Sequence, residues 1–151
     1  MQRIVKKINQ GRVYLFQHPT KSIEILSGLL SLFFGIVFII NGNLLIKNEF
    51  YQSFDYIGPK WIWWLVILLS TIQLNASRKD TLESNILSAI TLKVNALVTF
   101  IIALMFAADY PPLGTGFFTY SILSGFYLLA GIELSVQNTY ELLIRSENRK
   151  A

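Results

Sequence analysis

The chain has 151 residues, of which 53% are hydrophobic and only 15% are charged, and its formal net charge is +4. Soluble domains typically contain about 25% charged residues, so this composition excludes an ordinary soluble domain, and the abundance of apolar residues excludes a disordered chain. Cysteine is absent, which excludes disulfide frameworks, thiol nucleophiles and cysteine-rich zinc sites.

The N-terminal segment, residues 1–22, is rich in lysine and arginine. Within it, residues 2–17 combine apolar and basic side chains in a pattern typical of a short amphipathic helix lying in the headgroup plane of a membrane; a basic tail without regular structure is the alternative. The apolar stretch that follows is too long for a typical cleavable signal and has no small-residue cleavage site. We therefore expect this stretch to remain attached as a membrane anchor.

Four apolar segments follow in the chain. A helix that crosses a bilayer needs about 20 mostly apolar residues, and the segments that approach or reach this length are 23–46, 59–76, 86–108 and 117–136. Segment 59–76 is the shortest, and a buried helix of a soluble protein is the alternative interpretation for it. We predict an all-α integral membrane four-helix bundle with residues 23–136 as the transmembrane domain and residues 137–151 as a cytoplasmic C-terminal tail.

The distribution of basic residues predicts the topology. They gather in the N-terminal segment, in the loop between the second and third apolar segments, and in the C-terminal tail. The positive-inside rule then places both termini in the cytoplasm, as four spans require. These basic groups would meet anionic lipid headgroups, so the net charge does not indicate nucleic acid binding. Three tryptophans are then expected as anchors at the outer interface: Trp61, Trp63 and Trp64.

Small residues recur at helical spacing within three of the predicted spans. Association of helices in lipid depends on close backbone approach, so these positions are candidates for helix contacts. Two interpretations remain open: packing of the four helices within one chain, or an oligomer built through one stripe, with the glycines of the first span as the first candidate. The positions are Gly28, Ser31, Gly35, Gly42, Ala89, Ala96, Ala103, Ser124 and Gly131.

The third span also carries a polar face, formed by Asn85, Ser88, Asn95 and Thr99. Polar groups in lipid need hydrogen-bond partners or water. We therefore expect this face to point into the bundle or into a subunit contact.

Two charged residues lie inside predicted spans, namely Lys93 and Glu133. Lys93 is about 10 Å inside the third span, and its long side chain could reach back to the inner interface. A salt bridge between the two, separate snorkelling, or a proton or ion relay are the interpretations considered. Glu24 and Asp109 are expected to be solvated at span ends.

Catalytic motifs are absent from the sequence. There is no nucleophile elbow, phosphate-binding loop or paired-histidine zinc motif, and the single histidine, His18, is expected to make a local surface contact or helix cap. The carboxylates do not have metal-ligand spacing. We therefore expect a protein that is not an enzyme and has no metal or cofactor.

The chain resembles small four-span membrane proteins encoded in bacteriophage genomes. The resemblance rests on the basic start with His18 and Pro19, the first span containing Gly35, and the aromatic loop leading into Gly-Pro-Lys-Trp-Ile-Trp at 58–63. Trp64 departs from the pattern, in which a small residue often follows the second tryptophan. The resemblance implies an accessory role in the inner membrane or in association with the virion.

Three functional hypotheses follow. The first is a non-enzymatic accessory or assembly component that packs against itself or against a membrane partner. The second is a holin-like pore former that permeabilises the inner membrane through the polar face of the third span. The third is a small channel or transporter that uses Lys93 and Glu133.

Overall fold

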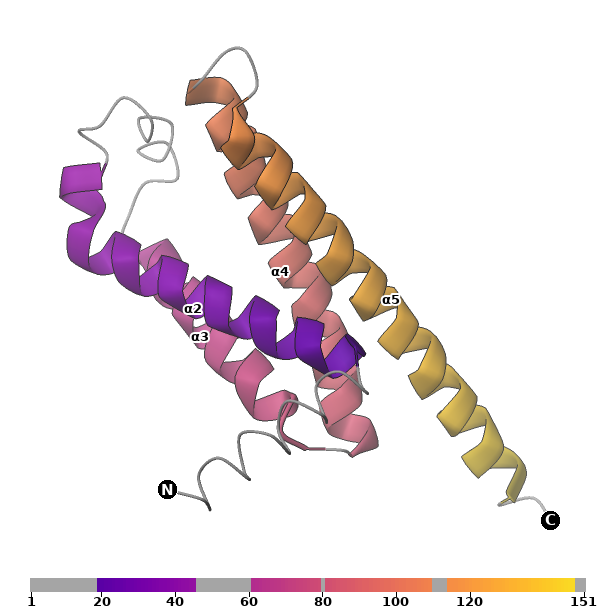
Figure 1. The fold of residues 1–151 in the computed structure, drawn as a ribbon. Coiled ribbons are helices and arrows are strands. Elements are labelled where there is room, and N and C mark those ends of the chain that lie inside the picture. Colours follow the sequence, from indigo (N-terminus) through magenta and orange to yellow (C-terminus); the bar gives the residue numbers. More distant parts are fainter. Residues whose placement is uncertain (1–18, 46–60, 80, 110–113, 149–151) are drawn as a thin grey trace, which may run out of the picture.

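The computed structural model describes residues 19–45, 61–79, 81–109 and 114–148, and these residues are organised as helices (Figure 1). The helices of the described part are α2 (Pro19–Leu45), α3 (Trp61–Ala76), α4 (Leu82–Asp109) and α5 (Thr115–Asn148). The all-α prediction is therefore confirmed. The amphipathic helix expected over residues 2–17 lies outside the described residues.

Three of the described helices are long and apolar enough to cross a membrane: α2 over Pro19–Asn41, α4 over Leu82–Ala108, and α5. This indicates an integral membrane protein. The 16-residue helix α3 is apolar but shorter. At a rise of 1.5 Å per residue it is about 24 Å long, against a hydrocarbon core of about 30 Å.

Local chemistry defines two of the helix starts. Pro19 is the first residue of α2, a position where its fixed φ suits a helix and its missing N–H costs nothing. Before α4, Thr81 and Ser84 form a reciprocal cap: the Ser84 N–H donates to Thr81 Oγ1 over 3.3 Å, and the Thr81 N–H donates to Ser84 Oγ over 3.1 Å. This arrangement satisfies backbone donors that have no partner within the helix.

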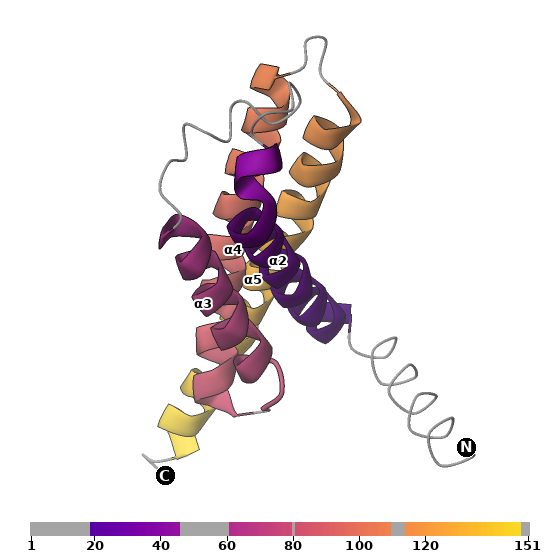
Figure 2. The ribbon, with the colours of Figure 1, turned by 90° about the vertical axis from the view of Figure 1, so that its left-hand side faces the viewer.

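The helices form two pairs. Helix α2 packs along α3 and helix α4 packs along α5, and these two pairings are the most extensive in the fold. The α2–α3 pair crosses the α4–α5 pair at an angle (Figures 1 and 2). The last turns of α5 extend beyond the start of α4 (Figure 1).

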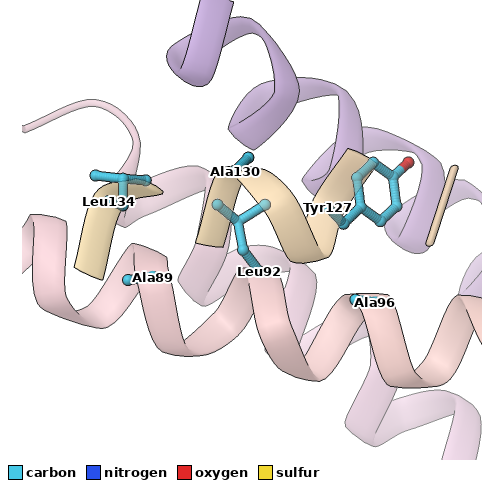
Figure 3. Packing of buried hydrophobic residues seen from close by; sticks show 6 residues of the cluster. All are labelled: Ala89, Leu92, Ala96, Tyr127, Ala130 and Leu134. Carbon is cyan, nitrogen blue, oxygen red and sulfur yellow. The ribbon is translucent and has the colours of Figure 1, made fainter. Parts of the chain in front are cut away.

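The α4–α5 pair is held by a closely packed apolar seam. Figure 3 shows three residues of α4 facing three of α5: Ala89, Leu92 and Ala96 opposite Tyr127, Ala130 and Leu134. The alanines let the backbones approach, which is what packing in lipid requires. A Cβ added at Gly131 would lie only 3.2 Å from the Ala89 carbonyl oxygen.

A second apolar cluster joins the two helix pairs near the C-terminal end of α2. It contains Phe38, Trp63, Val66 and Ile102. The rings of Phe38 and Trp63 stack with their centroids 4.2 Å apart, an arrangement that adds to the gain from burial. The cluster therefore places one residue from each of α2 and α4 against α3.

The expectation that all three tryptophans anchor an interface is wrong for Trp63. Trp61 and Trp64 are 57% and 60% exposed, whereas Trp63 is 5% exposed. Successive helix residues turn by about 100°. Trp63 is therefore about 200° from Trp61, on the face of α3 that meets α2.

Two glycines of the first predicted span pack against another helix of the same chain. A Cβ at Gly28 would lie 2.8 Å from Leu74, and a Cβ at Gly35 would lie 2.6 Å from Ile67 and 3.2 Å from the Trp63 carbonyl oxygen. All of these neighbours belong to α3. These glycines therefore set the distance between α2 and α3. At Gly42 the structure describes the helical backbone alone.

We expect Gly35→Leu to lower the free energy of unfolding in detergent by about 1–3 kcal/mol, which is the usual cost of overpacking. Gly125→Leu is the matched control, because a Cβ at Gly125 would meet nothing within 4 Å. Thermal unfolding followed by circular dichroism measures both variants. Equal unfolding temperatures would contradict the packing of α2 on α3.

Candidate functional site

The candidate site is a cluster of buried polar side chains between the two helix pairs. We call it the polar cluster, and it draws residues from α2, α3 and α4. Every member is at most 8% exposed. The members are Glu24, Ser27, Ser31, Gln73, Ser88, Thr91 and Asn95.

Helical spacing aligns these residues. The members on α2 are separated by three and then four residues, and so are the three members on α4. Residues at these separations share one face of a helix. The two faces are in register, because Glu24 pairs with Ser88 and Ser31 pairs with Asn95, each 64 residues further along.

Glu24 is the acceptor on which the cluster converges. Ser88 Oγ donates to Glu24 Oε2 over 2.7 Å, and Lys21 Nζ lies 3.6 Å from the same oxygen. Glu24 is fully buried, whereas Lys21 is 12% exposed. The expectation of a solvated boundary residue was therefore wrong for Glu24. Its position on α2 turns it toward α4, and Lys21 stands one helical turn before it.

Gln73 extends the chain of hydrogen bonds to α3. Its Nε2 donates to Ser88 Oγ over 2.9 Å, and its Oε1 accepts a hydrogen bond from Thr91 Oγ1. Both ends of the amide are thus held by α4. The donors run in one direction from Gln73 through Ser88 to Glu24, an arrangement in which each bond polarises the next.

Asn95 forms the second part of the polar cluster, further toward the C-terminal end of α4. Its Nδ2 donates to Ser27 Oγ over 3.0 Å, and its Oδ1 accepts from Ser31 Oγ over 3.3 Å. The side chain therefore bridges two successive turns of α2.

Four buried side-chain oxygens of the described residues have no hydrogen-bond partner. They are Glu24 Oε1, Asn85 Oδ1, Ser121 Oγ and the Tyr127 hydroxyl. The Tyr127 side chain lines a cavity of about 30 Å³ together with Ser31 and Thr99. Tyr120 lines the same space, which is large enough to hold a water molecule.

The predicted polar face of the third span lies largely in the interior. Ser88 and Asn95 are fully buried, Thr99 is 7% exposed, and Asn85 is partly buried. The predicted small residues of α4 and α5 also face inward. Ala89, Ala96 and Ala103 are buried, and Ser124 Oγ donates to the Ala96 carbonyl over 2.8 Å.

The two intramembrane charges of the sequence are not brought together. Lys93 Nζ donates to Ser135 Oγ over 2.8 Å, whereas Glu133 is exposed and accepts from Gln137. Lys93 and Glu133 therefore do not form a salt bridge. Ser135 and Glu133 are two residues apart, about 200° around α5, so the face that meets Lys93 turns Glu133 away. The side chain of Asp109 lies outside the described residues.

No protein-family model, curated protein or solved structure matches this chain.

The polar cluster has the chemistry of a structural contact between helices, built from hydrogen bonds. It contains one carboxylate, two amides and four hydroxyls, and the ammonium group of Lys21 lies beside it. Among the residues that the structure describes, no group of three histidine, cysteine, aspartate or glutamate side chains could hold a metal ion. The cluster joins α2, α3 and α4 through hydrogen bonds that lipid cannot replace.

The members of the site that sequence reasoning missed are Glu24, Ser27, Gln73 and Thr91. A signal was present on α2, where Glu24, Ser27 and Ser31 share one face at the same spacing as the polar residues of α4. Gln73 carried the same signal, because Ser70, Gln73 and Ser77 are separated by three and then four residues, and all three are buried.

We expect Asn95→Ala to lower the free energy of unfolding in detergent by about 1–2 kcal/mol, because each interhelical hydrogen bond in membrane proteins contributes about 0.6 kcal/mol and at most about 1.7. Asn75→Ala is the control, since Asn75 is exposed on α3. Thermal unfolding followed by circular dichroism compares the two. A loss no larger for Asn95→Ala than for the control would show that the buried amide does not hold the pairs together.

Proposed function

We propose that the protein is a non-enzymatic membrane protein that acts through helix packing, as an accessory or assembly component of a membrane complex. The observation that carries this proposal is the division of polar and apolar surface. The buried polar side chains bond to one another inside the bundle. The exposed sides of the helices are lined by large apolar residues.

The outer face of α5 is the contact surface that best fits this role. It carries the exposed apolar residues Ile122, Phe126 and Leu129 around Gly125. A Cβ at Gly125 would meet nothing within 4 Å, in contrast to Gly28 and Gly35. A small residue on the outside lets another helix approach closely, so we propose self-association through this face.

The test uses the absence of native cysteine. Gly125→Cys should form a disulfide-linked dimer on mild oxidation in membranes, whereas Leu68→Cys, exposed on α3, should remain monomeric. Gly125→Leu should reduce dimers without lowering the unfolding temperature, because the site is open in the monomer. A protein that stays monomeric in membranes, or dimers of equal yield at both cysteines, would contradict self-association.

A holin-like pore former is the second candidate, supported by the nature of the contact between the helix pairs. Water can replace hydrogen bonds such as those of Ser88, Thr91 and Asn95. Separation of the pairs would therefore expose a polar strip suited to line a water-filled lesion. The membrane potential should then collapse when the protein is expressed on a timed schedule, and an unchanged potential at high expression would exclude this candidate.

A further inference from the structure

An open groove of about 440 Å³ runs along the α4–α5 pair on the outside of the bundle. Most of its wall belongs to the C-terminal half of α5, and α4 contributes one residue. The lining residues are Lys93, Ile132, Ser135, Val136, Thr139, Tyr140 and Leu143.

The Lys93 side chain lies along this groove and points toward one end of the bundle. A Cβ added at Gly131 would lie 3.0 Å from Lys93 Cγ, while Lys93 Nζ lies 2.8 Å from Ser135 Oγ. The side chain thus runs about one helical turn, roughly 6 Å, from the level of Gly131 to that of Ser135. Because α5 runs antiparallel to α4, this direction leads toward the basic loop with Arg78 and Lys79.

The positive charge of Lys93 is not neutralised within the groove. No carboxylate lines it, and the ammonium group forms no salt bridge with any described residue. Its partner, Ser135, is a neutral hydroxyl whose own proton is donated to the Gly131 carbonyl over 2.9 Å. An ammonium group at a lipid-facing surface is costly without an anionic partner.

The rest of the groove suits the chain of a lipid. Ile132, Val136 and Leu143 give an apolar wall, and Tyr140, which is 65% exposed, carries a phenol at the edge. Ile132 lies about 5 Å further into the bundle than Ser135, whereas Tyr140 and Leu143 lie beyond Ser135 toward the C-terminal end of α5.

We infer that this groove binds one anionic phospholipid of the leaflet on the basic side of the bundle. The phosphate would contact the Lys93 ammonium, and an acyl chain would lie along Ile132 and Val136. The apolar face of a partner helix would cover the same wall but would leave the ammonium unmatched, whereas a phospholipid supplies both the anion and the chain. Ile132 and Val136 continue the face of α5 that carries Gly125, seven and eleven residues further along the helix.

The test measures lipids retained by the full chain. Protein purified from membranes is mixed with phosphatidylglycerol and phosphatidylcholine in equal amounts, and bound lipids are counted by native mass spectrometry. Wild type should retain one phosphatidylglycerol preferentially. Lys93→Met should reduce that preference about five-fold, from about 1 kcal/mol per basic residue. Lys79→Gln, which removes an exposed lysine from the nearby loop, should not.

Two further variants keep the result decisive. Lys93→Arg should retain the preference, because the charge is preserved. Val136→Glu should abolish it, because a carboxylate would compete for Lys93. Circular dichroism verifies that each variant is helical. Equal retention in wild type, Lys93→Met and Val136→Glu would overturn the site, and so would an equal loss in Lys79→Gln. Displacement of the lipid by glycerol phosphate would overturn the role of the acyl chain.

Discussion

A buried carboxylate that must be satisfied inside the protein is the constraint on which the rest of this structure depends. Glu24 is fully buried, and its partners come from three places: Ser88 on α4, Gln73 on α3 through Ser88, and Lys21 on its own helix. Lipid offers no hydrogen bonds to replace these. The two helix pairs can therefore separate only if water or another polar group takes the place of the partner helix.

Close packing makes this arrangement possible. The hydrogen bonds of the polar cluster require α2, α3 and α4 to approach one another, and small residues provide the space. Gly28 and Gly35 bring α2 against α3, while Ala89, Ala96 and Gly131 bring α4 against α5. The apolar stack of Phe38 on Trp63 closes the other end of the contact. Polar pairing and small-residue seams are thus two parts of one mechanism of association.

The sequence predicted the helices well because hydropathy and length depend on local composition. It also predicted that Ser88, Asn95 and Thr99 share a face in need of partners. It did not predict which partners they find, since that depends on how the helix pairs cross. Glu24 was assigned to the boundary from its position along the chain, although its direction around α2 decides its burial.

The same distinction explains Lys93. Depth along a span can be counted from the sequence, and Lys93 and Glu133 do lie toward the same end of the bundle. The angle around each helix relative to its neighbours is a tertiary property, and it gives Lys93 the hydroxyl of Ser135 instead of the Glu133 carboxylate. What remains is an ammonium group on the outer surface, which directs attention to the surrounding lipid.

A double-mutant cycle between Glu24 and Ser88 tests the central claim most directly. The free energies of unfolding in detergent of wild type, Glu24→Ala, Ser88→Ala and the double variant give the coupling between α2 and α4. A buried hydrogen bond across this contact predicts a coupling energy of about 0.6–1.7 kcal/mol. Effects that add to within about 0.3 kcal/mol would contradict the claim that this bond holds the two helix pairs together.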